Sequence, residues 1–292
     1  MRRLALVAAS TIAVACASQT TPSSNPTPAN PAPPPPPAPG APPPAPAQPV
    51  RLGPSALRYL MHQVVHIDQE FQGMRQPLDF GLRIYFAVTI SGPADSVGYP
   101  TTITIDSIAP DSGSAVPMGI NLGAAKALSF RGRLTPKGDF HAPSPSDSVA
   151  AQALSPIVGS FRNFFPRLPP GGLTLGAAWT DTTTENERAA GNITITSVNR
   201  SRAAAWEDRS GARALRLEVT TDFKIQGGGQ QAGQPFEVNG TGLRSGVDYI
   251  AVDGRFLGGE AHDSTNMTIT LPIQAMTIPR TQVSKSTVTV LP

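Results

Sequence analysis

The alternation of apolar and polar residues most restricts how this chain can fold. In residues 82–90 every second position is a large apolar residue, from Leu82 to Ile90, and the positions between them include Arg83 and Thr89. A period of two places the apolar side chains on one face of an extended strand, as in a half-buried antiparallel sheet. The same pattern, enriched in β-branched residues, recurs at 102–105, 215–219, 267–271 and 288–290.

Turn residues between these segments favour antiparallel hairpins. Asp253-Gly254 separates two apolar segments and predicts a type I′ turn, and Pro136 to Asp139 predicts a second hairpin. The fold class is therefore mainly β. We expect long antiparallel strands in one or two curved sheets, arranged as an incomplete barrel or as a sandwich.

One segment, at about 147–165, has helical periodicity. Ser155 and Pro156 fit the N-cap and the first helical residue, and Pro166 ends the pattern. The apolar face of this central amphipathic helix consists of Ile157, Val158, Phe161, Phe164 and Phe165. Three phenylalanines on one face favour a role in the core, on the concave side of a sheet. The same three rings, Phe161, Phe164 and Phe165, are also our candidate site for an apolar ligand.

The N-terminus has the features of an export signal. Arg2 and Arg3 precede an uncharged, mostly apolar run that is too short for a permanent membrane helix. We therefore assign residues 1–15 to a signal peptide.

Cys16 is the one cysteine of the chain and directly follows Ala13-Val14-Ala15. This segment resembles a bacterial lipobox, which implies lipidation of Cys16. Ala13 stands where lipoboxes usually have leucine, and Ala13-Val14-Ala15 also satisfies the small-x-small rule for ordinary signal peptidase. Cleavage by signal peptidase II or I is thus left open. By similarity to lipoprotein sorting, Ala17 and Ser18 favour the outer membrane, because neither is aspartate.

Proline defines the next segment, residues 16–50. Fifteen of the 32 prolines lie at 22–49, and residues 17–50 contain no charge. This composition favours polyproline II and has nothing from which to build a core, so it predicts a disordered tether. Residues 51–292 remain as a single β-rich domain, which the helix divides into two halves.

The charge balance argues against a nucleic-acid partner. The formal net charge is +3, but without Arg2 and Arg3 there are 21 basic residues against 20 acidic ones. Binding to phosphates needs clustered Lys and Arg, which this domain lacks.

No motif identifies a reaction. The chain has no Gly-x-Ser-x-Gly elbow and no Ser-x-x-Lys nucleophile, and with one cysteine it has no basis for disulfides or thiolate metal sites. His62 and His66 have the spacing of a zinc-protease helix, but Gln63 replaces the required glutamate. Residues 59–71 fit a strand at least as well as a helix. On a strand the two imidazoles would stand about 13 Å apart, too far to share an ion, whereas on a helix they could bind one together. We expect no metal, no cofactor and no enzymatic activity.

A longer block carries a family resemblance. Residues 164–173 read FFPRLPPGGL and are followed by WTDT at 179–182, with QEFQG at 69–73 upstream and ALRL at 214–217 downstream. This set resembles bacterial envelope lipoproteins that have no established activity. The resemblance implies an envelope location and supplies no catalytic residues.

Together these features predict a noncatalytic lipoprotein, anchored in the outer membrane through Cys16 and facing the periplasm or the cell surface. Its concave sheet is expected to bind a lipid or another hydrophobic small molecule. The alternative is a structural or protein-interaction module of the cell envelope without a small-molecule ligand.

Overall fold

A computed structural model describes residues 48–114, 121–187, 191–231 and 233–292. Its strands are β1 (Ser55–Phe71), β2 (Met74–Ile90), β3 (Tyr99–Pro110), β4 (Ser129–Leu134), β5 (Phe140–Pro145), β6 (Ala178–Glu187), β7 (Asn192–Arg209), β8 (Ala212–Gln231), β9 (Gln234–Ala251), β10 (Phe256–Leu271) and β11 (Met276–Leu291). Its helical elements are α1 (Ser148–Ala153), α2 (Ser155–Val158) and the 3-10 turns η1 (Leu122–Ala125), η2 (Gly159–Asn163) and η3 (Pro272–Gln274).

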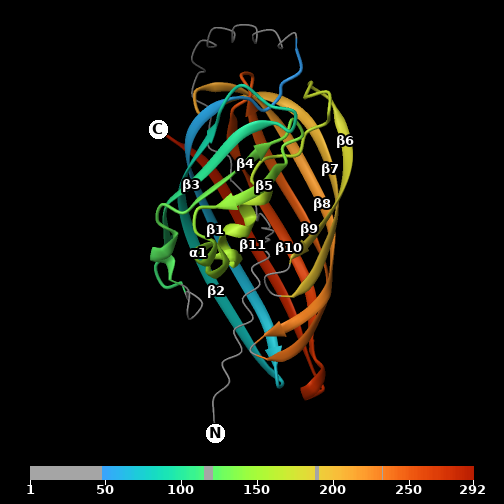
Figure 1. Cartoon of the computed structure of the whole chain (residues 1–292). Coiled ribbons are helices and arrows are strands. Elements are labelled where there is room, and N and C mark those ends of the chain that lie inside the picture. Colours follow the sequence, from blue (N-terminus) through green and yellow to red (C-terminus); the bar gives the residue numbers. More distant parts are fainter. Residues whose placement is uncertain (1–47, 115–120, 188–190, 232) are drawn as a thin grey trace, which may run out of the picture.

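Within the described residues, eleven antiparallel strands form one open sheet in the order β5-β4-β3-β2-β1-β11-β10-β9-β8-β7-β6 (Figure 1). The mainly β prediction is confirmed, and the arrangement is a single curved sheet. Each sequence half contributes one side, and the halves meet where β1 pairs with β11. β5 and β6 are the two free edges. All five alternating segments of the sequence lie within strands, namely β2, β3, β8, β10 and β11.

The predicted helix lies across the concave side of the sheet, as Figure 1 shows, but it is divided into α1, α2 and η2. Asp147 caps α1, because its carboxylate accepts hydrogen bonds from the N–H groups of Val149 and Ala150. The expected cap at Ser155 is wrong by one residue. Leu154 ends α1 and also occupies the N-cap position of α2, so Ser155 is already helical.

One turn prediction needs correction, and one glycine-rich segment forms an unexpected strand. The hairpin at Asp253-Gly254 joins β9 to β10, but only Gly254 has a positive φ, whereas a type I′ turn needs two such residues. Residues 227–229 are three consecutive glycines, a composition typical of a loop, but they belong to β8 and pair with β9. Their β conformation follows from ladder pairing, which outweighs the weak strand propensity of glycine.

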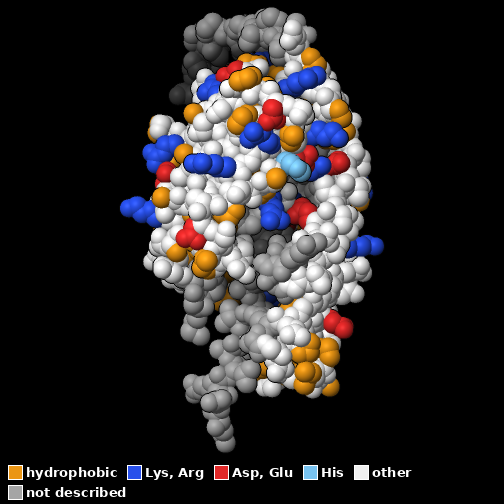
Figure 2. Space-filling view, in the orientation of Figure 1, with side chains coloured by type: hydrophobic (Ala, Val, Ile, Leu, Met, Phe, Trp, Pro, Cys, Tyr) orange, Lys and Arg blue, Asp and Glu red, His pale blue; other side chains and the backbone are white. Residues whose placement is uncertain are grey.

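Residues 1–47 lie outside the described residues, and with them the predicted signal peptide, Cys16 and nearly all of the tether. In the part of the chain that is described, none of the helices has the length and apolar character needed to cross a membrane. On the visible face, acidic and basic side chains are interspersed over the described surface (Figure 2).

Candidate functional site

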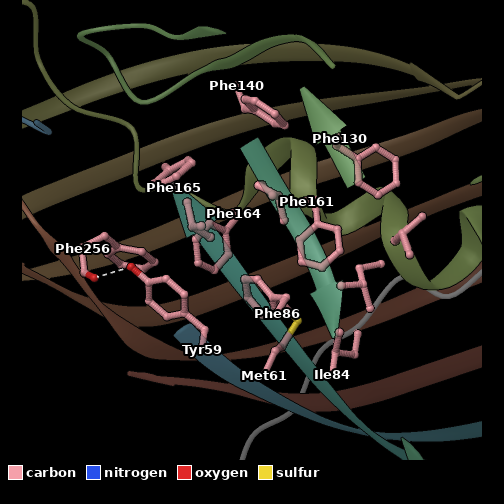
Figure 3. Close-up of a cluster of buried hydrophobic side chains, with 14 of the residues drawn as sticks. Tyr59, Met61, Ile84, Phe86, Phe130, Phe140, Phe161, Phe164, Phe165 and Phe256 are labelled. Carbon is pink, nitrogen blue, oxygen red and sulfur yellow. Dashed lines mark hydrogen bonds between the residues drawn. The ribbon is translucent and has the colours of Figure 1, made fainter. Parts of the chain in front are cut away.

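The three phenylalanines of the predicted helix come together in a buried aromatic cluster (Figure 3). Phe161, Phe164 and Phe165 are 2%, 7% and 3% exposed. The ring centroid of Phe164 lies 5.2 Å from those of Tyr59 and Phe256, in edge-to-face contacts. These rings belong to a first core cluster, which fills the space between the helical segment and the strands behind it.

Tyr59 anchors this aromatic cluster to the β9–β10 hairpin. Its hydroxyl donates a hydrogen bond to the carbonyl oxygen of Phe256 at 2.7 Å. Burial raises the pKa of the Tyr59 hydroxyl above its usual range, although Arg255 opposes the shift. The hydroxyl therefore stays protonated and acts as a donor.

A cavity of about 620 Å³ lies at the gap between the two sheet edges. Its lining includes Phe130, Phe140 and Phe161, with Arg162 and Asn186 among the polar residues. The segment that carries the helix also bridges this gap. Arg167 forms ion pairs with Asp139, in the β4–β5 turn, and with Asp181 of β6.

A second apolar cluster lies on the inner face of the sheet, separate from the first. It comes from β7 to β11 and consists of Ile193, Phe223, Ile225, Val238, Met267, Ile269, Leu271 and Ile278. None of the residues in this second cluster comes from α1, α2 or η2. Because β7 to β11 continue well past the helical segment (Figure 1), the sheet has an apolar inner face beyond the first core.

Between the two clusters, the inner face carries polar side chains. Strand register aligns Ser284, Asp263, Arg244, Thr221 and Asn199 across β11, β10, β9, β8 and β7. The Arg244 Nε lies 3.5 Å from an Asp263 carboxylate oxygen, and the Thr221 hydroxyl donates to the Asn199 amide oxygen at 2.8 Å. Desolvation raises the pKa of Asp263 to about 7, although Arg244 opposes the shift. We call this set the polar row.

Next to the polar row, Thr265 of β10 and Gln282 of β11 are register partners. Thr265 is 1% exposed and Gln282 is fully buried. The Gln282 amide oxygen accepts a hydrogen bond from Arg280 Nη2 at 2.8 Å. The Thr265 hydroxyl oxygen and the Gln282 amide nitrogen have no hydrogen-bond partner among the described residues. Sequence reasoning did not identify this pair, because the alternation of β11 does not mark its polar residues as inward-facing.

His62 and His66 lie on β1, so the strand interpretation of this segment is confirmed. Their neighbours differ: His62 Nε2 lies 2.6 Å from Asp111, and His66 Nδ1 lies 2.7 Å from Asp79. The His62 hydrogen bond is the largest of several interactions that lower the pKa of Asp111. No group of three or more His, Cys, Asp or Glu residues with the geometry of a metal site occurs in the described ranges.

The features that distinguish this chain are thus an open eleven-stranded sheet, a phenylalanine-bearing segment on its concave side, and a second apolar cluster separated from the first by polar residues. No protein-family model and no curated protein matches the chain.

Proposed function

We propose that this chain is an exported lipoprotein of the bacterial outer membrane, anchored through Cys16, that binds an apolar ligand such as a lipid acyl chain on its concave face. The observation that carries the ligand proposal is the second apolar cluster, which lines the inner face beyond the helical segment. Ligand sites are typically concave and mostly apolar, with a few polar groups that orient the ligand. The polar row supplies such groups.

The role that we propose is noncatalytic, and we propose that the protein faces the periplasm or the cell surface. Its support is the lack of a nucleophile or metal motif in the sequence. The lipid anchor rests on the position of Cys16 between an export signal and a proline-rich tether.

The filled first cluster favours a second function. Phe161, Phe164 and Phe165 are packed against other rings, and a filled core is what a structural or protein-interaction module of the envelope needs. In a module without a small-molecule ligand, the second cluster would be part of the hydrophobic core, like the first.

Native mass spectrometry distinguishes the two functions. The whole chain is produced in a bacterial host, purified from the cell envelope and measured before and after organic extraction. An apolar ligand predicts a stoichiometric, extractable lipid adduct in addition to any covalent anchor. A mass that does not change on extraction contradicts the ligand proposal and favours the structural module.

A matched pair of variants locates the adduct. Ile269 is 9% exposed on the inner face of β10, and Thr268 precedes it on the opposite face. Ile269→Glu is expected to abolish the adduct, whereas Thr268→Glu keeps it. Circular dichroism confirms the fold of each variant. If Ile269→Glu does not fold, Ile269→Phe, which fills volume without adding charge, takes its place.

A further inference from the structure

We propose that the inner face of β10 and β11 binds the carboxyl or ester oxygen of an acyl lipid, through the unpartnered Thr265 hydroxyl and Gln282 amide. The inference rests on the proposed function, because it assumes that an apolar ligand occupies the concave face. It adds a headgroup chemistry and a binding orientation.

Both side chains project from the concave face. Tyr59 packs on Phe164 of the helical segment, which places its face of β1 on the concave side. Ile67 follows Tyr59 by eight positions, so the period of two puts it on the same face. Ile67 pairs with Gln282 of β11, which in turn pairs with Thr265 of β10. Side chains of directly paired residues share a face, so both polar groups point toward the region that the ligand would occupy.

The hydrogen-bonding capacity of the pair defines what it can bind. The oxygen of Gln282 already accepts a hydrogen bond from Arg280, so its free capacity is the donor NH₂ group. The Thr265 hydroxyl can also donate. A buried donor without an acceptor is unfavourable, and two such donors side by side match a ligand that presents acceptor oxygens.

On the β9 side, the neighbour of Thr265 is a glycine. This register partner is Gly242, which in turn pairs with Phe223 of β8. A Cβ atom at Gly242 would lie 2.2 Å from the Phe223 ring, so the ring occupies the place of a β9 side chain. Across β9, the neighbour of the polar pair is thus an aromatic surface instead of a third polar side chain.

The apolar chain of the ligand would extend toward the β10–β11 hairpin. From Thr265 to Leu271 the strand advances about 20 Å at roughly 3.3 Å per residue. The inward positions along this length are Met267, Ile269 and Leu271, all buried. Toward the other end, the polar row with Asp263 and Arg244 is unfavourable for a hydrocarbon chain. An acyl lipid therefore fits with its oxygens at Thr265 and Gln282 and its chain along the second cluster.

Three probes with closely similar unsaturated hydrocarbon chains test the inference on the whole chain after extraction of any bound lipid: oleic acid, methyl oleate and octadecene. Affinities are measured by displacement of a fluorescent apolar dye. Gln282→Met and Thr265→Val keep side-chain volume but remove the donors. Each is expected to weaken binding of oleic acid and methyl oleate about five- to tenfold, as the loss of one hydrogen bond predicts, and to leave octadecene unchanged.

The controls make the same substitutions away from the inner face: Gln226→Met at an exposed position of β8 and Thr268→Val on the opposite face of β10. Both should bind all three probes like the original chain. If the inner-face variants bind every probe equally well, the headgroup assignment is wrong while apolar binding stands. If no probe displaces the dye from the original chain, the proposed function fails as well.

Discussion

At the scale of single residues, the inner face holds ionisable groups in apolar surroundings. These surroundings make the charged forms of the groups unfavourable. Desolvation raises the pKa of Asp263 from its ordinary value of 3.8 to about 7 and that of Asp248 to about 6, while it lowers the pKa of Arg280 to about 10. The three residues lie on the adjacent strands β9, β10 and β11. The polar part of the concave face therefore changes its charge near neutral pH.

This titration predicts a pH-dependent stability. The folded chain keeps the Asp263 proton between about pH 4 and pH 7, where the unfolded chain has lost it, so the free energy of unfolding falls as the pH rises through this window. A shift of three pKa units corresponds to at most about 4 kcal/mol. Asp263→Asn cannot ionise and is expected to raise the unfolding temperature at pH 8 by at least about 3 °C, with little change at pH 4.

Thermal unfolding followed by circular dichroism at both pH values checks this prediction. The control Asp208→Asn alters an exposed carboxylate of β7. Equal shifts at pH 4 and pH 8 for Asp263→Asn would rule out desolvation of its carboxylate as the cause.

At the scale of elements, the β9–β10 hairpin depends on one glycine. Gly254 has a φ of 86°, and a Cβ atom there would lie 2.3 Å from the carbonyl oxygen of Arg51. Its own carbonyl accepts a hydrogen bond from the N–H of Gly53 at 3.2 Å. The turn is thus held against the segment that enters β1, and both the backbone conformation and the close approach require glycine.

We therefore expect Gly254→Ala to destabilise the fold by about 2 kcal/mol or more, because it combines a left-handed backbone penalty with a steric clash. Gly211, in the β7–β8 turn, is the matched control. Its φ is 73°, but a Cβ atom there meets nothing within 4 Å. Gly211→Ala should cost about 1 kcal/mol, the backbone penalty alone. Urea unfolding compares the two variants, and equal losses would exclude a role for the contact with Arg51.

At the scale of the whole molecule, the pairing of β1 with β11 joins the two sequence halves. Arg58 near the start of β1 pairs with Leu291 at the end of β11, so this contact spans almost the whole described chain. The same pairing extends the concave face from one half to the other. Such long-range pairing carries a large loop-closure cost, which favours slow folding.

The proposed anchor is also a property of the whole molecule. Several acyl chains on Cys16 would hold the folded domain stably at a membrane. Cys16→Ser is expected to move the protein from the membrane fraction to the soluble periplasmic fraction, because Ala13-Val14-Ala15 still permits ordinary cleavage. Globomycin, which inhibits lipoprotein signal peptidase, should make the unprocessed precursor of the original chain accumulate. Unchanged partitioning and processing would contradict lipidation.

The short-range features of this fold could be predicted from the sequence. Period-two alternation identified segments of β2, β3, β8, β10 and β11, and the phenylalanine spacing identified the helical segment on the concave side. These patterns can be recognised in the sequence because the apolar side chains that contact a core recur with the periodicity of the strand or helix that carries them. β6 and β7 were not predicted as strands, because threonine, asparagine and arginine on both faces obscure that period.

The strand order and the polar groups of the candidate site depended on the tertiary structure. In β11, Ile278, Arg280, Gln282 and Ser284 share the inner face, while Val283 lies on the other, so hydropathy alone would orient the middle of this strand incorrectly. Its orientation comes from pairing with β1 and β10, whose buried residues establish which face is concave. The sequence by itself determined the type of local structure, because periodicity reflects neighbours a few residues away. The single open sheet and the juxtaposition of Thr265 with Gln282 were decided by contacts between distant strands, which no local pattern encodes.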